Sequence, residues 1–262
     1  MENSQNNGRP FLVSVARDFN MYDKCVGTNP NLDGFRKIVF HNDVQNLSIT
    51  ERYNWFIDKF LPGEDCWVVF CHEDWRVEED LAAVIRDLNP EKIYGPIGIF
   101  LQHRHYRDVY YHVGRIRMCR KDGSDLISLG QNSMARGRVD TLDCQCVIVH
   151  SSLIRKFSLR FDENLRYDMY VEDFCASAHE KYGLITEVCP IRCTHFSYGV
   201  LGESFYNSLE YIRDKFKNSR KGYLSVVGNK SWFGHRNHWV LHRTHFPRIT
   251  SHFNIAIDKR NR

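Results

Sequence analysis

Three groups of polar side chains in this sequence could take part in chemistry: His72-Glu73-Asp74, Glu172-Asp173 and the isolated His195. The first group directly follows the apolar run 67–71, whose β-branched and aromatic residues predict a buried strand. Carboxylate oxygens and imidazole nitrogens are metal ligands, and a metal held by them can bind a phosphate. The group therefore predicts a divalent-metal site at the end of a strand.

Each group also has a purely structural explanation. Glu73 or Asp74 could cap the helix that is predicted to follow, because a carboxylate accepts hydrogen bonds from the first N–H groups of a helix. Glu172-Asp173 could be an ordinary acidic first turn, which the helix dipole favours. His195 could be a core histidine whose ring is hydrogen-bonded within the protein. Taken one at a time, the groups leave both explanations open.

Together the three groups would suit the transfer of a sugar from a nucleotide-sugar donor. The diphosphate of such a donor leaves as an anion, and a divalent cation held by carboxylate and imidazole stabilises that charge. A separate carboxylate, placed across the sugar, could take the proton from an incoming hydroxyl. The transition state resembles that of glycoside hydrolysis, and positioning of the two substrates contributes much of the rest.

Strand and helix patterns alternate through the first hundred residues. Strands are predicted at 11–16, 37–40, 67–71 and 93–100, and helices at 22–27, 49–60 and 78–88. This alternation predicts βαβ units and a largely parallel sheet. In open α/β sheets ligands bind at the carboxyl ends of the strands, which is where His72, Glu73 and Asp74 are expected.

The pattern loosens between residues 101 and 138, where a hairpin is predicted around 120–124 and an insertion is expected to shape the site. Buried strands at 142–149 and 184–189 follow, with a helix beginning at 151, another closing at Gly183 and a third at 209–216. The tail 218–262 is basic and His-rich, but its histidines lack the spacing of a zinc site. Solvated surface or acceptor contacts are the favoured interpretation of that tail.

Composition limits the class of protein. The chain has 262 residues, of which 42% are hydrophobic and 26% charged, as in ordinary globular proteins. A net charge of +4 is too weak to indicate nucleic-acid binding. The nine cysteines are scattered through apolar runs, which favours buried, reduced thiols and a cytoplasmic protein. The sequence shows no signal-peptide core and no apolar run long enough to span a bilayer, and it is compatible with peripheral association with a membrane.

Several common site motifs are absent from the sequence. It contains no G-x-G-x-x-G, no P-loop, no G-x-S-x-G and no H-E-x-x-H. This absence removes dinucleotide binding, nucleotide triphosphate hydrolysis, serine hydrolysis and zinc proteolysis as first choices.

A set of short motifs occurs in a particular order along the chain: 13–16, Asp43, 49–54, 68–74, 139–149, 161–164, 170–174 and His195. In this order they resemble a GT-A-fold glycosyltransferase of the family-two type, in the branch where His-x-Asp replaces the usual Asp-x-Asp. The resemblance covers residues 10 to 200. It implies an α/β fold with a Rossmann-like, mostly parallel central sheet flanked by helices, in a single domain with a C-terminal extension.

The same resemblance implies a division of the chain into parts. A disordered tail is expected at 1–10, followed by the glycosyltransferase domain at 11–200. Within that domain, residues 11–100 would form the nucleotide-binding half and 101–200 the acceptor half. Residues 201–262 would form a helical and basic extension.

The implied activity is that of an inverting glycosyltransferase, which moves a sugar from a nucleotide-sugar donor to a hydroxyl acceptor in glycan or polysaccharide assembly. Mn²⁺ or Mg²⁺ is the implied cofactor, and no nucleic-acid partner is expected. The resemblance implies that Asp74, His195 and His72 bind the metal. It implies donor binding by Ala16, Asp43, Asn54 and Asp74. Asp173 would be the catalytic base, with Glu172 as second candidate, and Asp143 would bind the acceptor.

Two other classes of protein stay open. The first is a relative of the same fold that serves only as a binding or scaffolding domain, since His72 replaces the first aspartate of the usual metal motif. Such a domain should bind no sugar nucleotide. The second is a nucleic-acid-binding protein that uses the basic tail after residue 218, which predicts steeply salt-dependent binding.

Overall fold

The computed structural model describes residues 8–61, 63, 65–104, 107–124, 126–130, 136–197 and 202–219, together with the short strands β14 (Tyr223–Leu224) and β15 (Ser231–Trp232). Most of the tail expected at 1–10 lies outside the described residues. The same holds for most of the basic tail after 219, including its five histidines.

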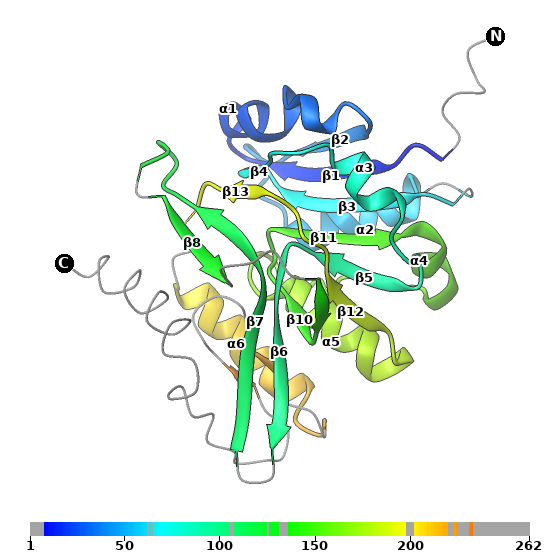
Figure 1. Ribbon diagram of the computed structural model, residues 1–262, viewed down its shortest axis with the longest axis vertical. Coiled ribbons are helices and arrows are strands. Elements are labelled where there is room, and N and C mark those ends of the chain that lie inside the picture. The colour runs from blue at the N-terminus through cyan, green and yellow to red at the C-terminus, as the bar shows by residue number, and fades with distance from the viewer. Residues whose placement is uncertain are drawn as a thin grey trace.

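A seven-stranded sheet, in the order β2-β1-β3-β11-β5-β12-β9, forms the centre of the molecule (Figure 1). Strand β1 pairs in parallel with β2 and β3, and β5 pairs in parallel with β12, while the other three pairings are antiparallel. The predicted α/β class with a central sheet flanked by helices is confirmed, and the sheet is more mixed than expected. Its strands are β1 (Phe11–Ala16), β2 (Arg36–His41), β3 (Trp67–His72), β5 (Lys92–Gly95), β9 (Gly137–Val139), β11 (Cys146–His150) and β12 (Ile185–Val188).

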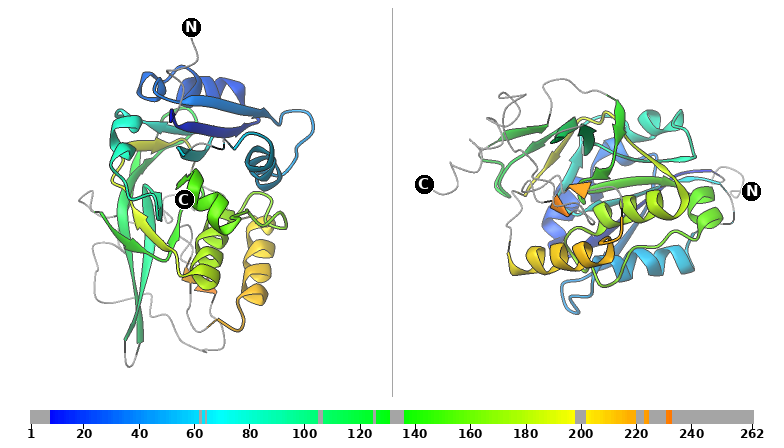
Figure 2. Two further views of the ribbon diagram at one scale, coloured as in Figure 1. Left: turned by 90° about the vertical axis from the view of Figure 1, so that its right-hand side faces the viewer. Right: turned by 90° about the horizontal axis from the view of Figure 1, so that it is seen from below.

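Each face of the central sheet has its own cover (Figure 2). Because side chains alternate along a strand, Val13 and Val15 belong to one core, and Leu12 and Ala16 to the other. The first core lies under the helices α2 (Ile49–Lys59), α4 (Ser151–Phe157), α5 (Tyr170–Tyr182) and α6 (Glu203–Lys215). The second lies under the short helices α1 (Phe19–Tyr22), η1 (Asp23–Gly27), η2 (Pro30–Leu32) and α3 (Leu81–Arg86) and a second sheet.

The second sheet is built largely from the stretch in which the sequence pattern loosens. It has the order β10-β6-β7-β13-β4, and β8 pairs with β7. Its strands are β4 (Trp75–Val77), β6 (Ile97–Arg104), β7 (Arg107–Met118), β8 (Ile127–Gly130), β10 (Thr141–Leu142) and β13 (Cys193–His195). The hairpin predicted around 120–124 is confirmed, because β7 and β8 are antiparallel and Gly123, with φ of +87°, donates to the carbonyl of Arg120.

Several predicted elements differ from the observed ones. The strand expected at 142–149 is divided into β10 and β11, which belong to different sheets, and the helix expected at 209–216 begins already at Glu203. The strand expected at 93–100 is divided at Pro96 into β5 and β6, which belong to different sheets. Proline has no N–H to donate and commonly interrupts a ladder. The helix expected at 78–88 begins only at Leu81, since Trp75 and Val77 alternate with Arg76 as strand β4 and both are buried.

Local chain chemistry explains the elements that were predicted correctly. Ser48 and Glu51 form a reciprocal capping box at the start of α2. Helix α5 ends at Gly183, whose φ of +69° is the left-handed conformation that glycine adopts readily. Among the described helices, none has both the length and the apolar character needed to cross a membrane.

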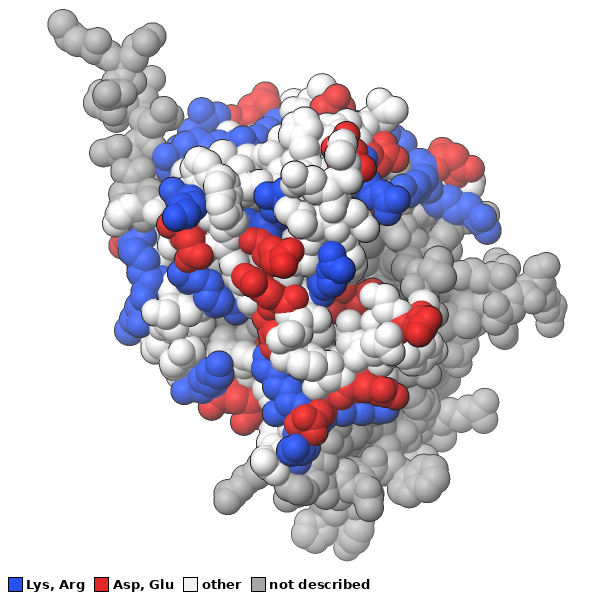
Figure 3. Space-filling view, turned by 180° about the vertical axis from the view of Figure 1, so that it is seen from behind, with Lys and Arg blue, Asp and Glu red and all other residues white. Residues whose placement is uncertain are grey.

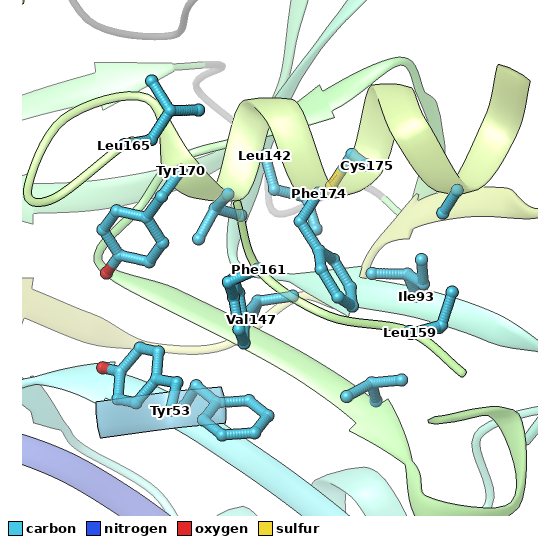
Figure 4. Close-up of a cluster of buried hydrophobic side chains, with 14 of the residues drawn as sticks. Tyr53, Ile93, Leu142, Val147, Leu159, Phe161, Leu165, Tyr170, Phe174 and Cys175 are labelled. Carbon is cyan, nitrogen blue, oxygen red and sulfur yellow. The ribbon is translucent and has the colours of Figure 1, made fainter. Parts of the chain in front are cut away.

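An aromatic cluster anchors α2 and α5 to the central sheet (Figure 4). The ring of Phe161 contacts the rings of Tyr53, Phe70, Tyr170 and Phe174 at centroid distances from 4.6 to 5.9 Å. The hydroxyl groups of Tyr53 and Tyr170 point out of the same side of this cluster, as Figure 4 shows. Both hydroxyls therefore leave the apolar core near the carboxyl end of β3.

Candidate metal centre

Three side chains from two sheets meet at the carboxyl end of β3: His72, Asp74 and His195. One ligand atom of each lies within 4.8 Å of those of the other two. His72 ends β3, whereas His195 ends β13, which pairs antiparallel with β4 just after Asp74. The backbone N–H of Phe196 donates to the carbonyl of Asp74 over 2.9 Å and fixes this approach. The structure thus brings together the three predicted metal ligands.

The geometry of this cluster fits a divalent cation. His195 Nε2 lies 3.1 Å, and His72 Nδ1 3.9 Å, from the same oxygen, Asp74 Oδ1. Asp74 Oδ1 and His195 Nε2 are buried and pair with each other, and within the described part of the chain neither makes an aligned hydrogen bond to a third group. Two imidazoles with one carboxylate suit Mn²⁺, Fe²⁺ or Zn²⁺.

Two of the three protonation states agree with this fit, whereas Asp74 outweighs burial and raises the pKa of His195, so a metal would have to displace a proton from that ring. Burial lowers the pKa of His72, which favours the neutral imidazole that a metal requires. Burial alone would raise the pKa of Asp74, but His195 and His72 outweigh it and hold that pKa well below its usual range. Asp74 is therefore an ionised carboxylate at neutral pH.

Tyr170 determines which nitrogen of His72 faces the cluster. The Tyr170 hydroxyl lies 2.8 Å from the carbonyl oxygen of Cys144 and 2.8 Å from His72 Nε2. A carbonyl can only accept, so the single Tyr170 proton is donated to Cys144, and the tyrosine oxygen must accept from His72 Nε2–H. In the neutral ring the lone pair is then on Nδ1, the nitrogen nearer to Asp74. Such partners of ligating histidines tune metal affinity.

We expect Tyr170→Phe to weaken Mn²⁺ binding by about 10- to 100-fold, because the phenyl ring keeps the packing but releases the His72 tautomer. Calorimetric titration of the full chain with Mn²⁺ would measure the loss. Tyr94→Phe is the matched control, since Tyr94 is also buried and its hydroxyl bonds to backbone atoms of Asn89, away from the cluster. Equal Mn²⁺ affinity in the two variants would contradict the role of Tyr170.

A cleft of about 290 Å³ opens beside the cluster at the carboxyl ends of β1, β2 and β3. The cluster contributes His72 and Asp74 to its wall, and the exposed side chain of Arg17 adds a positive charge. An arginine next to a candidate metal centre is suited to bind phosphate oxygens. The remaining lining residues are Val15, Asn42, Asn46, Ile49, Glu73 and Tyr167.

Glu73 has a structural role in that wall. Its Oε2 accepts hydrogen bonds from the backbone N–H groups of Arg17, at 2.5 Å, and Asp18, at 2.9 Å. Glu73 therefore holds the loop after β1 in place instead of capping a helix after Trp75. The helix α3 is capped by Asp80, whose Oδ1 accepts from Ala83.

Glu172 and Asp173 lie near the start of α5, but their side chains have different neighbours. Both oxygens of Asp173 contact Lys215 Nζ of α6, at 2.8 and 2.9 Å. Burial raises the pKa of Asp173 to about 6 even though Lys215 opposes the shift. Burial, and after it the charges of Asp143 and Glu172, raise the pKa of the Cys144 thiol.

The remaining predicted site residues have varied positions. Ala16 lies between two lining residues, with its carbonyl accepting from the N–H of Asn42 over 2.8 Å. Asp43 is exposed and adjoins the cleft next to Asn42. Asp143 is buried, and its charge acts to raise the pKa of both cluster histidines.

Asn54 differs from the prediction, because its amide is occupied within the fold. Its Nδ2 donates to the carbonyl of Phe161 and to Glu163 Oε1, both at 2.9 Å, and its Oδ1 accepts from the N–H of Phe161 at 2.9 Å. These bonds join α2 to the turn after Phe161. Asn54 does not line the cleft, so its amide contributes to the architecture of the site and not to the donor surface.

Sequence reasoning did not single out Tyr170, Arg17 or Asp168 as site residues. Asp168 acts electrostatically on His72, and its Oδ2 accepts from Ser204 Oγ over 2.7 Å. Asp168 and Tyr170 both lie just before the Glu172-Asp173 motif, and Arg17 directly follows the first strand. Their positions beside known motifs were the available signal, but only the folded arrangement shows what they contact.

No protein-family model and no curated protein matches this chain. Among solved structures, a crystal structure of GalNAc-T7 with UDP, GalNAc and Mn²⁺ has a TM-score of 0.49 and 9% identity, over 80% of this chain and 48% of that chain. A crystal structure of A197 from STIV has a TM-score of 0.40 and 13% identity, over 90% and 98% of the two chains. The chain thus spans about half the length of the GalNAc-T7 chain. At these identities and scores neither likeness bears on the chemistry of the site.

Proposed function

We propose that this chain is a metal-dependent glycosyltransferase of GT-A type that uses a nucleotide-sugar donor and inverts the transferred sugar. The observation that carries this proposal is the cluster of His72, Asp74 and His195 at the mouth of a cleft formed by strand ends. Ligands of open α/β sheets bind at that edge. A cation beside Arg17 would be positioned for a diphosphate.

We assign a role in this reaction to each of several residues. A bound cation would supply electrostatic stabilisation of the leaving diphosphate. Arg17 would bind the same phosphates, and the strand-end loops around Ala16 and Asp43 would contact the nucleoside. Asp173 is the proposed base, since a carboxyl with a pKa of about 6 suits proton abstraction near neutral pH. Asp143 would act on the acceptor side, and Glu172 is the second candidate for the base.

The test is a thermal-shift screen of UDP-, GDP-, CMP- and dTDP-linked sugars, each without metal and with Mn²⁺, Mg²⁺, Fe²⁺ or Zn²⁺. A ligand at a hundred times its Kd stabilises the folded state by about 2.7 kcal/mol. For a chain of this size that corresponds to an increase in Tm of roughly 5–10 °C. We expect one nucleotide class to give such a shift only when metal is present.

Two outcomes would change the proposal. A shift that needs no metal would keep nucleotide binding but remove the cluster of His72, Asp74 and His195 from the donor site. The absence of a shift with every donor and metal would contradict donor binding and favour the scaffolding alternative. Asp58→Asn is a suitable control for loss of a carboxylate, since Asp58 is exposed and pairs with Arg160 at the surface.

A further inference from the structure

A second cavity, of about 600 Å³, lies between the turn 164–167 and helix α6. Its lining includes Tyr167, which also lines the cleft beside the metal cluster. The next residue, Asp168, accepts a hydrogen bond from Ser204 of α6 and acts electrostatically on His72. The cavity, which we name the α6 groove, therefore begins where the cleft ends. A molecule bound in it would have one end near the candidate metal centre.

The α6 groove is lined by a polar stripe on helix α6. Ser204, Asn207, Ser208 and Tyr211 recur at i, i+3, i+4 and i+7, the spacing of one helix face. The apolar residues of the same helix, Phe205, Leu209 and Ile212, lie in the core instead. Packing of the apolar residues against the core thus turns the polar stripe toward the groove.

The stripe carries no charge and offers both donors and acceptors. Hydroxyl and amide groups can do both, which matches a ligand whose own hydroxyls donate and accept. Within the described residues, the side chains of Asn207 and Ser208 make no hydrogen bond, so their groups are available. The two tyrosines, Tyr167 and Tyr211, add rings that can pack against the apolar face of a sugar.

The rim of the groove balances its charges, with Glu203 and Arg166 contributing one charge of each sign. Among the described residues that Figure 3 shows, acidic and basic side chains are also interspersed. A polyanion would gain little from such a surface. A neutral polyhydroxyl ligand fits it better.

The walls of the groove are fixed by hydrogen bonds that do not involve a ligand. Asp162 Oδ2 accepts from Tyr211 at 2.8 Å and from Lys215 Nζ at 2.6 Å, which joins the turn to α6. Lys215 also pairs with Asp173, the proposed base. On the other wall, Tyr167 donates to backbone carbonyls of Asn46 and Leu47. The groove is thus preformed, as small-molecule sites usually are.

We propose that the α6 groove binds the acceptor and that the acceptor is a neutral oligosaccharide. This inference rests on the proposed glycosyltransferase function, since it assigns the second substrate of the same reaction. The acceptor would lie along Asn207 and Ser208, with its reactive hydroxyl toward Tyr167 and the metal cluster. In the transfer step the acceptor oxygen forms a bond to the anomeric carbon, the bond to the nucleoside diphosphate breaks, and the acceptor proton passes to the base.

The test combines three measurements on the full chain. An array of immobilised neutral and acidic oligosaccharides measures glycan binding in the presence of Mn²⁺ and UDP. A thermal shift measures metal-dependent donor binding, and hydrolysis of the donor sugar without acceptor measures activity that does not need the groove. The variant is Asn207→Ala combined with Ser208→Ala. Glu210→Ala is the control, because Glu210 is an exposed residue of α6 outside the stripe.

We expect the native chain and Glu210→Ala to bind neutral glycans, and the double variant to bind them about tenfold more weakly. Two hydrogen bonds of ordinary strength account for such a loss. Donor binding and donor hydrolysis should be the same in all three proteins. Unchanged glycan binding in the double variant would overturn the assignment of the groove.

The failure of this inference can be distinguished from failure of the proposed function. If the native chain binds a nucleotide sugar with metal but no neutral glycan, the neutral acceptor is wrong and the donor site stands. If it binds only acidic glycans, the charge argument is wrong. If it binds neutral glycans through Asn207 and Ser208 but no donor, the groove stands as a glycan site and the glycosyltransferase function falls.

Discussion

Replacing Asp74 by Asn is expected to weaken Mn²⁺ binding by more than about 100-fold and to lower transfer by about 10²–10³-fold. We expect a loss of Mn²⁺ affinity above about 100-fold, because replacing a residue that only hydrogen-bonds to a metal ligand already lowers metal affinity by about 10- to 100-fold. The loss of rate follows because a single electrostatic contact to a developing anion is worth about 10²–10³. Asparagine keeps the shape of Asp74 and its backbone bond to Phe196 but removes the charge between the two histidines.

Calorimetric Mn²⁺ titration and initial rates of sugar transfer would measure these losses. Asp58→Asn provides the matched control, because it removes an exposed carboxylate that pairs with Arg160 at the surface. Because the ionised form of Asp74 stabilises the folded chain at neutral pH, the Tm of Asp74→Asn without metal should fall below that of the native chain. A variant that binds Mn²⁺ normally would remove Asp74 from the metal centre, and with it the central element of the proposed function.

Replacing Asp173 by Asn is expected to abolish transfer, by about 10²–10⁴-fold, while leaving the protein as stable as the native chain or more stable at pH 7. The rate loss is the usual contribution of a positioned base. The stability effect follows from the raised pKa of Asp173, about 6 in the folded chain against 3.8 as its ordinary value. A raised pKa means that the folded state holds the proton more tightly than the unfolded state.

The sign of the pH dependence follows from this difference. As pH rises from about 4 to 6, ionisation of Asp173 reduces the free energy of unfolding by up to about 3 kcal/mol. Asparagine cannot ionise, so the Asp173→Asn variant should gain relative stability over this interval and lose the advantage below pH 4. Lys215 keeps Asp162 as a partner in the variant, so its ammonium group is not left unpaired.

Urea unfolding at pH 4 and pH 7, together with transfer rates, would test both parts. Glu172→Gln is the informative companion, because it changes the neighbouring buried carboxylate. Full activity in Asp173→Asn with loss in Glu172→Gln would transfer the role of base to Glu172. A marked loss of stability in Asp173→Asn at pH 7 would instead identify its pair with Lys215 as a structural salt bridge.

The sequence predicted those elements whose signals are local. The apolar spacing predicted the start of α2 at Ile49, where Ser48 and Glu51 form the observed cap, and Gly183 marked the end of α5. The apolar run of β3 and the polar residues after it also lie within one short stretch. In each case the residues that determine the element are neighbours in the chain, so single-sequence patterns contain them.

The second sheet and the metal cluster depend on contacts between distant residues. Strand β4 has only three residues, and the acids after it resemble a first helical turn, so its pairing with β13 was not predictable from its pattern. That same pairing brings His195 to Asp74. The ordered motifs indicated His195 as a ligand, but no local pattern shows its distance from Asp74 or the hydrogen bond from His72 to Tyr170.

The cluster draws its ligands from both sheets, since His72 ends a strand of the central sheet and His195 ends a strand of the second. A cation bound there would cross-link His72 to His195 and so close the long chain segment between these two residues. Closing a long segment restricts the unfolded chain most, and a ligand specific to the folded state adds its binding energy to folding. Chelation should therefore raise amide hydrogen exchange first in the short pairing of β4 with β13, well before the central strands. Loss of metal would then lower the local stability of the second sheet as well as the proposed activity.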